Sequence, residues 1–242
     1  MPWDFWLILF ILGVVLPWRG LQRMRALMLQ PEVSGRERIR LYVSTILFQW
    51  TLTALIAWRA YARGLNAKEL GLVFGSLLVV PVVTLAGALV IAVGHWKNIR
   101  RMARSNHPAA QRLRALAVRI FPRTPLEAIL YIALALTAGI CEEFIFRGFL
   151  LAAFTRAGLS SWLVVLATAA IFGLAHLYQG RGGSLGTGIL GVLFAIARIA
   201  YTSLLPVVVW HAVLDIVAGV AGGRYLVAEI STVEPLQTSG ND

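Results

Sequence analysis

Seven runs of apolar residues, separated by charged or Gly/Pro-rich breaks, divide the chain. A helix needs about 20 predominantly apolar residues to cross the hydrocarbon core of a bilayer, and several of these runs reach that length. The pattern predicts an all-α protein, a polytopic transmembrane helical bundle of about seven spans. The spans are expected at Phe5–Leu16, Leu41–Trp58, Leu70–Gly94, Leu126–Phe154, Ser161–Tyr178, Leu185–Ala200 and Leu204–Gly222.

Local signals refine the ends of these spans. The Pro-Trp-Arg run at 17–19 is expected to close the first span. We interpret that span as a retained anchor, because Met-Pro-Trp-Asp offers neither the basic start nor the cleavage site of a signal peptide. Pro81 is expected to kink the third span. Before the fourth span, Thr124 is a candidate N-cap, with Pro125 at the first helical position and Glu127 in the first turn.

Composition supports the membrane interpretation. The chain is 59% hydrophobic and 14% charged, whereas soluble domains carry about 25% charged residues. The sequence suggests three parts: N-terminal helices with basic loops (1–124), a C-terminal helical core (125–222) and a frayed tail (223–242), polar toward its end. The single cysteine, Cys141, excludes an intrachain disulfide and a cysteine metal cluster.

The net charge of +11 is unevenly distributed. Of 22 basic residues, 14 lie in the two segments Arg19–Arg40 and Lys97–Arg123. Basic clusters beside membrane helices orient them and attract anionic lipid headgroups, so we expect membrane lipid and not nucleic acid as the partner. The alternation of strongly and weakly basic loops along the chain predicts that the N-terminus lies outside and both basic loops lie in the cytoplasm. The expected location is a bacterial inner (plasma) membrane.

The second basic segment contains a further pattern. Leu113, Leu116 and Ile120 share one helical face, and Arg112 and Arg119 lie beside it. This spacing is typical of a short helix in the membrane interface, although a solvated basic linker explains it equally well.

Ionisable residues inside the spans gather in the C-terminal half of the chain. Charge inside a lipid-spanning segment costs several kcal/mol unless it is paired or hydrated, so such residues are functional candidates. Near the end of the sixth span, Arg198 is expected to extend its side chain to the interface. The full set is Glu142, Glu143, Arg147, His176, Arg198, His211 and Asp215.

Helical spacing sorts these residues. Glu143 and Arg147 are four apart with the acid first, which favours a structural ion pair. Glu142 points about 100° away from Glu143 and is left without a local counter-charge. His211 and Asp215, also four apart, project from one face. A glutamate, two histidines and an aspartate can bind zinc or activate water without a metal.

Depth along the helices leaves an inconsistency. At 1.5 Å per residue, Glu142 lies about 18 Å from the outer end of its span, His176 about 22–25 Å and His211 about 10–12 Å. If the three side chains meet, then helix tilt, a kink or a misplaced boundary has to absorb this difference.

Three spaced motifs carry a family resemblance. The chain reads Glu142-Glu143-Phe-Ile-Phe-Arg147, then Phe172-Gly-Leu-Ala-His176, then His211-Ala-Val-Leu-Asp215. It resembles the CPBP family of CAAX-processing and bacteriocin-processing intramembrane proteases, also called the Abi family, whose motifs are E-E-x-x-x-R, F-x-x-x-H and H-x-x-x-N or H-x-x-x-D. The resemblance covers about Pro125 to Gly222.

The resemblance implies an intramembrane endopeptidase. In the family pattern Glu142 is the catalytic glutamate, His176 shares the activation of water, and His211 with the residue at 215 completes the site. Where the family has Asn, an amide N–H can donate to the developing oxyanion, whereas ionised Asp215 only accepts. Asp215 is therefore protonated, or orients His211, or ligates a metal.

The cofactor and the class of function stay open at this point. The family is named as metalloproteases, so a divalent metal such as zinc, held by Glu142, His176, His211 and Asp215, is one expectation, and metal-free water activation is the other. A proton- or ion-coupled carrier also uses buried Glu, His and Asp, although the chain shows no duplicated half. A non-catalytic membrane scaffold, for example in bacteriocin immunity, is the remaining alternative.

Overall fold

The computed structural model describes residues 2–227. Within these residues no strand occurs, so the prediction of an all-α chain is confirmed. Three π-helical turns (η1, η2, η4) continue longer helices, and η3 is a 3-10 turn. The elements are α1 (Trp3–Phe10), η1 (Ile11–Val15), α2 (Leu16–Leu29), α3 (Gly35–Ala62), α4 (Val79–Ala103), α5 (Pro108–Ile120), α6 (Pro125–Glu143), η2 (Phe144–Leu150), α7 (Leu151–Arg156), α8 (Ser161–Ala175), η3 (Leu177–Gln179), α9 (Gly180–Tyr201), α10 (Leu205–Gly222) and η4 (Gly223–Val227).

Within residues 2–227, six helical stretches are long and apolar enough to cross a membrane, and the shorter apolar helix α8 makes a seventh segment, close to the predicted count. Their outward faces carry large apolar side chains, for example Leu85, Leu89 and Val90 on α4. Soluble monomers rarely expose such continuous apolar surface, which suits contact with lipid chains. The chain is an integral membrane protein. The six stretches are Trp3–Leu29, Gly35–Ala62, Val79–Ala103, Pro125–Arg156, Leu177–Tyr201 and Leu205–Val227.

Two predictions about prolines are wrong. Pro17 does not end the first span, because α1, η1 and α2 run on from Trp3 to Leu29. Pro17 lies in the first turn of α2, directly after the wider π-helical turn η1. A proline ring crowds the carbonyl of the preceding turn, and the wider turn leaves room for it. Pro81 does not kink the third span, because α4 begins only at Val79 and the first turn of a helix does not need the missing N–H.

The start of α6 agrees with the sequence signals. The side chain of Thr124 accepts a hydrogen bond from the backbone N–H of Glu127 (3.3 Å), and Pro125 is the first helical residue. Glu127 also forms a buried ion pair with Arg38 of α3, with N–O distances of 2.9 and 3.1 Å. This pair fixes the start of α6 against the start of α3.

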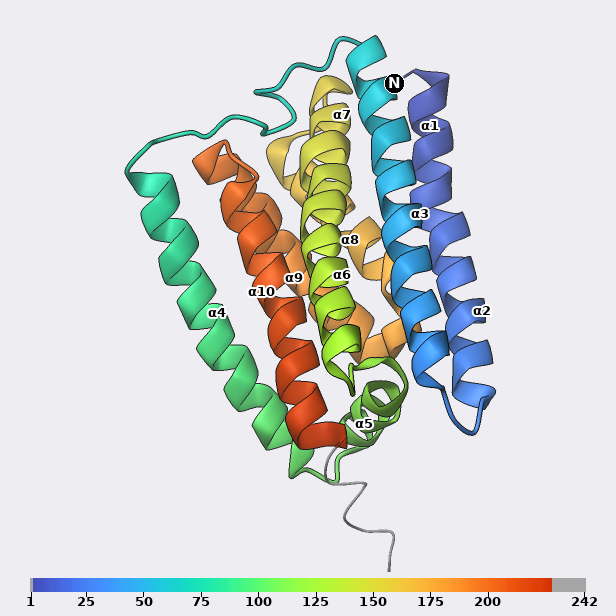
Figure 1. The fold of residues 1–242 in the computed structure, drawn as a ribbon. Helices are drawn as coiled ribbons and strands as arrows, with labels where there is room; N and C mark the ends of the chain where they lie inside the picture. The colour runs from blue at the N-terminus through green and yellow to red at the C-terminus, as the bar shows by residue number, and fades with distance from the viewer. Residues whose placement is uncertain (1, 228–242) are drawn as a thin grey trace, which may run out of the picture.

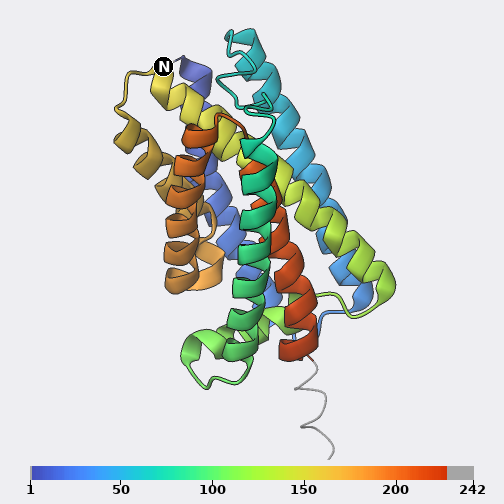
Figure 2. The same ribbon diagram turned by 90° about the vertical axis from the view of Figure 1, so that its left-hand side faces the viewer.

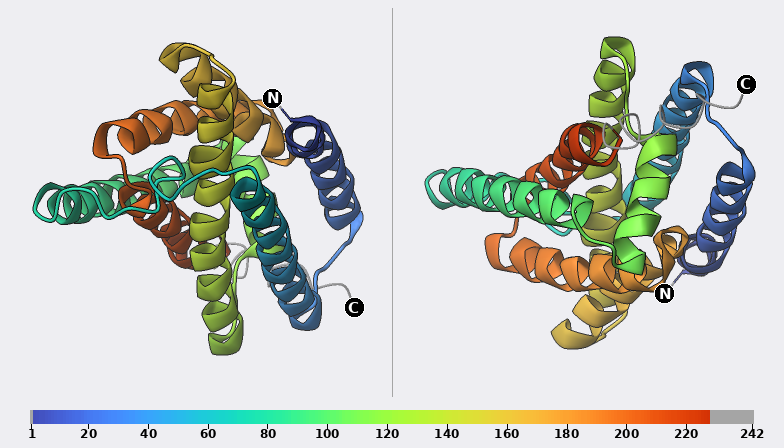
Figure 3. Two further views of the ribbon diagram at one scale, coloured as in Figure 1. Left: turned by 90° about the horizontal axis from the view of Figure 1, so that it is seen from above. Right: turned by 90° about the horizontal axis from the view of Figure 1, so that it is seen from below.

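The helix formed by α6, η2 and α7 lies in the middle of the bundle. Figure 3 shows it between α3 on one side and α10 on the other, and both neighbours pack against α6. Helix α4 packs on the outside of α10, and the hairpin of α8 and α9 packs beside η2. Figure 2 shows that α6 crosses the bundle obliquely, and this tilt is one of the ways in which side chains at unequal depths along their own helices can meet.

The two basic segments lie at the same end of the bundle. The turn from α2 to α3, the end of α4 and the helix α5 are together in Figure 1, opposite the N-terminus and the segment that joins α3 to α4. The predicted short helix of the second basic segment is present as α5. Its position in a membrane interface stays a prediction.

Arg198 does not extend to the interface as expected. Its side chain is buried, and Nη2 donates to the carbonyls of Lys68 (3.2 Å) and Glu69 (2.9 Å) in the segment between α3 and α4. Arg156 donates to the carboxylate of Glu69 from the other side, and this contact lowers the pKa of that carboxyl group. Arg198 therefore holds a loop in place, because loop carbonyls lie within its reach.

The predicted fraying from Arg224 onward is also wrong for the first residues of the tail. Residues 224–227 continue α10 as the π-helical turn η4. Leu226 is buried, and the ring of Tyr225 packs edge-on against Trp96 of α4. The rest of the predicted tail, 228–242, lies outside the described residues.

The pair between Arg38 and Glu127 generates a stability prediction. Arg38→Met removes the cation and leaves Glu127 buried without its ionic partner, which typically costs about 3–5 kcal/mol. We expect a large drop in the melting temperature of the detergent-solubilised protein. Arg40→Met, an exposed neighbour on the same helix, is the control and should change stability by less than about 0.5 kcal/mol. Equal melting temperatures for the two variants would contradict the structural role of the pair.

Candidate functional site

A buried ion pair lies at the junction of α6 and η2. Glu143 and Arg147 are both fully buried, and Oε1 of Glu143 lies 2.8 Å from Nη1 of Arg147, so the predicted pair is present. Arg147 Cζ lies 4.0 Å from the ring centre of Phe172, and the ring of Phe194 is also close. Two other guanidinium nitrogens of Arg147 have no hydrogen-bond partner among the described residues, so these ring faces supply the remaining favourable contacts.

His211 of α10 contacts the same carboxylate. Its Nδ1 lies 2.7 Å from Oε1 of Glu143, and the side chain is 9% exposed. The close approach of α10 to α6 depends on Gly139, because a Cβ at that position would lie 2.8 Å from the carbonyl oxygen of Val208. Glu143 therefore does two things: it pairs with Arg147, and it orients His211. Helical spacing within one segment does not reveal the second contact.

Glu142 points away from this pair. It makes no ion pair with Arg147 in the described part of the chain, and its Oε2 is buried without a hydrogen-bond partner. That oxygen lies 3.7 Å from Nε2 of His176 and 3.9 Å from Nε2 of His211. The structure therefore brings Glu142 and both histidines together, although their depths along their own helices differ.

His176 ends helix α8. Its Nδ1 lies 2.8 Å from the backbone carbonyl of Phe172, in the last turn of the helix. The F-x-x-x-H spacing is therefore a helix C-cap in which the histidine is the capping residue. This bond fixes the ring and leaves Nε2 directed toward Glu142.

Asp215 lies at the edge of the cluster. Its Oδ2 is 3.7 Å from Nε2 of His211, which is longer than a hydrogen bond, and its side chain is 40% exposed. The bond that orients His211 comes from Glu143 instead. Asp215 is close enough to accept a hydrogen bond through a small movement or a bridging water.

The protonation pattern defines what the cluster can hold. A carbonyl oxygen and a carboxylate only accept hydrogen bonds, so the Nδ1 atoms of His176 and His211 both carry a proton. Neutral His176 then presents a lone pair on Nε2, directed toward the unpartnered Oε2 of Glu142. One water molecule can donate one hydrogen bond to Oε2 of Glu142 and one to Nε2 of His176, and the glutamate can then deprotonate it.

The donor set suits zinc in chemistry but not in spacing. Zinc bonds of about 2.0–2.1 Å place neighbouring ligand atoms of a tetrahedral site about 3.4 Å apart. The separations here are 3.7 and 3.9 Å, and the described residues contain no group of three or more His, Cys, Asp or Glu side chains arranged to hold a metal ion. The mechanism proposed below therefore uses only the side chains.

Sequence reasoning missed one member of the cluster. Nε2 of Gln49, on α3, lies 2.7 Å from Oε1 of Glu142. The candidates inside the spans were ionisable residues, and glutamine is not ionisable. A search for any polar side chain within an apolar span would have found Gln49 in the run LFQWTL.

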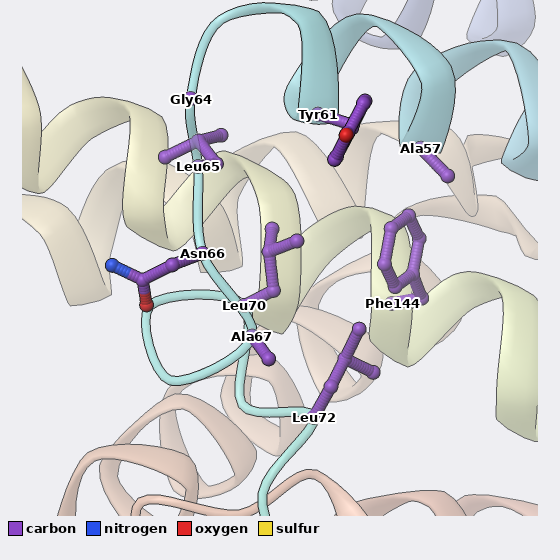
Figure 4. Close-up of a pocket in the computed structure, with 9 residues that line it drawn as sticks. All are labelled: Ala57, Tyr61, Gly64, Leu65, Asn66, Ala67, Leu70, Leu72 and Phe144. Atoms are coloured by element: carbon purple, nitrogen blue, oxygen red, sulfur yellow. The ribbon is translucent and has the colours of Figure 1, made fainter.

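An apolar groove adjoins the cluster without containing it. It has a volume of about 520 Å³ and lies between the end of α3, the segment that follows it and η2. Figure 4 shows Leu70, Leu72 and Phe144 facing into it, and Phe144 follows Glu143 directly in the chain. None of the polar residues of the cluster lines the groove.

Comparison with known proteins supports the resemblance seen in the motifs. Residues 124–217 match the family model described as Rce1-like, type II CAAX prenyl endopeptidase Rce1-like. The match covers less than half of the chain and includes all three motifs. No curated protein matches the chain, and no solved structure matches it.

The close approach at Gly139 gives a prediction for the site. Gly139→Ala places a methyl group against the backbone of α10 and pushes α10 away from α6, so the Glu143–His211 contact should weaken. We expect a lower melting temperature. Gly94→Ala on α4 is the matched control, because a Cβ there meets nothing within 4 Å and Ala favours a helix over Gly by about 1 kcal/mol. A Gly139→Ala protein as stable as Gly94→Ala would contradict the packing argument.

Proposed function

We propose that this integral membrane protein, in which residues 124–217 resemble the type II CAAX prenyl endopeptidases, is an intramembrane endopeptidase. One observation carries the proposal: inside a bundle of membrane helices, the unpartnered Oε2 of Glu142 faces Nε2 of two histidines from two other helices. This arrangement suits hydrolysis of a peptide bond within or near the membrane by direct attack of water.

Activation of water is the first step of the proposed mechanism. One O–H group of the water donates a hydrogen bond to Oε2 of Glu142, and the other donates to Nε2 of His176. As the water oxygen attacks the scissile carbonyl carbon, its first proton passes to Glu142. The side chain of Glu142 is 19% exposed, but its Oε2 is buried, so in the proposed reaction water reaches that oxygen through a small opening of the site.

Stabilisation of the oxyanion is assigned to His211. When the new C–O bond forms, the electrons of the carbonyl double bond move to its oxygen, which becomes negatively charged. In its imidazolium form His211 presents Nε2–H to that oxygen. The carboxylate of Glu143, at Nδ1, balances the positive charge, and Asp215 lies close enough to Nε2 to contribute.

Breakdown of the intermediate returns the proton. Glu142 donates the proton it took from water to the nitrogen of the leaving amine while the C–N bond breaks and the carbonyl reforms. The products are a new carboxyl group and a free amine, so one water is consumed and Glu142 is again a carboxylate. Arg147 takes no part in proton transfer, but its ion pair with Glu143 holds that carboxylate in place.

The proposed location follows from the charged end of the bundle. We place the basic end in the cytoplasm of a bacterial inner membrane and the N-terminus outside. Anionic lipid headgroups are the proposed partner of this end, in addition to the peptide substrate. On α4 a hollow of about 410 Å³ is lined by four cationic side chains on one helical face: Lys97, Arg100, Arg101 and Arg104.

The central prediction concerns Glu142. Glu142→Gln keeps the shape of the side chain but cannot accept a proton from water, so proteolysis should fall by at least about 100-fold. Peptidomics of membranes that contain the wild type or the variant would reveal the substrate as the peptides missing from the variant. Glu32→Gln, the same exchange at an exposed residue, is the control and should leave proteolysis intact.

The same comparison tests the other classes of function. Proteolysis that persists in folded Glu142→Gln protein would contradict the peptidase mechanism. Ion or proton uptake into liposomes that depends on Glu142 would favour a carrier. The absence of both activities in the wild type would favour a scaffold.

The ligand spacing generates a prediction about metal. Because the site lacks a closed set of three ligands, we expect proteolysis to survive chelation and the purified protein to hold less than one divalent metal per chain. Metal analysis before and after chelation, alongside activity, checks this expectation. Stoichiometric zinc that is lost together with activity, and that Glu142→Gln and His176→Ala fail to bind, would instead assign those side chains as ligands.

A further inference from the structure

Among the described residues, Gln49 is the side chain of α3 that forms a hydrogen bond with Glu142. It lies in the middle of a membrane span, where an unpaired amide is costly to bury. Its Nε2 donates a hydrogen bond of 2.7 Å to Oε1 of Glu142. An ionised carboxylate only accepts hydrogen bonds, so the NH₂ group of Gln49, and not its carbonyl oxygen, faces Glu142.

This bond restricts a side chain that otherwise turns freely. The last torsion of a glutamate is broad, so either oxygen can point in many directions. Gln49 holds Oε1, which leaves Oε2 as the oxygen directed at His176 and His211. In the proposed reaction Oε2 takes the proton from water, so its direction matters for the rate.

Helix α3 is held at a register that makes this contact possible. Arg38, Tyr42 and Gln49 are separated by four and seven residues, so they lie on one helical face. Arg38 pairs with Glu127 at the start of α6, and the hydroxyl of Tyr42 donates to the carbonyl of Ile120. The bond of Arg38 holds the start of α3 against α6, the helix that carries Glu142, and the bond of Tyr42 holds α3 against the end of α5.

A neighbouring bond supports the same register. Nε1 of Trp50 donates to Oγ1 of Thr137 on α6 (3.3 Å), one turn of helix before Cys141 and Glu142. The contact between Gln49 and Glu142 is therefore one of several interhelical bonds that align α3 with α6. It is the one that ends on the proposed catalytic base.

We infer that Gln49 is a positioning residue, which orients the Glu142 carboxylate toward the water that attacks the substrate. The inference rests on the proposed peptidase function. It also extends the site beyond residues 124–217, because α3 lies outside the segment that matches the peptidase family. The N-terminal half of the chain then contributes to chemistry and does not serve only as an anchor.

Kinetics on a peptide that the comparison of wild-type and Glu142→Gln membranes identifies as a substrate provide the first test. Gln49→Met keeps the length of the side chain and removes the hydrogen bond, so we expect kcat to fall roughly 10- to 100-fold while KM stays within about 2-fold. Thr51→Val on the same helix is the matched control. It removes only a bond to the carbonyl of Leu47 within α3, and it should leave both constants unchanged. Melting temperatures of both variants show whether a lower rate reflects lost folding.

Infrared spectroscopy tests the contact without relying on activity. The difference between wild type and Glu142→Gln isolates the carboxylate bands of Glu142. Gln49→Met should shift those bands, because the hydrogen bond to Oε1 is lost, and Thr51→Val should not. A merely structural role of Gln49 would lower stability without moving the bands of this one carboxylate.

The outcomes separate the inference from the function on which it rests. Unshifted Glu142 bands together with an unchanged kcat in folded Gln49→Met protein would overturn the positioning role and leave the peptidase proposal intact. Persistent proteolysis by Glu142→Gln would overturn the peptidase proposal, even if the bands shift. Shifted bands with a lower kcat and an unchanged KM would support both.

Discussion

The carboxylate of Glu143 is the contact on which the geometry of the site depends. It accepts hydrogen bonds from Arg147 on its own helix and from His211 on α10, and all three side chains are buried. Removing Arg147 leaves the buried carboxylate without its cationic partner on η2, which is far more costly than in water, and removing His211 breaks the contact that joins the two helices. The two helices are thus held at one separation, and this separation places His211 beside Glu142.

Around that contact the bundle arranges two adjacent glutamates in different surroundings. Glu143 is saturated by Arg147 and His211, whereas Glu142 receives one bond, from Gln49, and keeps one oxygen without a partner. The difference in chemistry between neighbours follows from the helix, which directs consecutive side chains about 100° apart. A saturated carboxylate maintains structure, and an unsaturated one can accept a proton from water.

Much of this site could be predicted from local spacing. The pair of Glu143 with Arg147 and the separate direction of Glu142 depend only on helical geometry within one segment, and the structure has both. Spacing could not reveal the contact of Glu143 with His211, since it joins helices that are distant in the chain. The placement of Arg198 was predicted wrongly for the same reason: the loop carbonyls that it meets come from residues about 130 positions earlier.

The sequence by itself determined the all-α membrane class, the start of α6 at Thr124 and the residues that carry the three motifs, because hydrophobic runs, capping and i, i+4 spacing are local properties. Only the tertiary structure decided that Gln49 meets Glu142 and that Glu143 meets His211. Helix tilt, packing at Gly139 and the register of α3 set those contacts, and each depends on atoms that are remote in sequence.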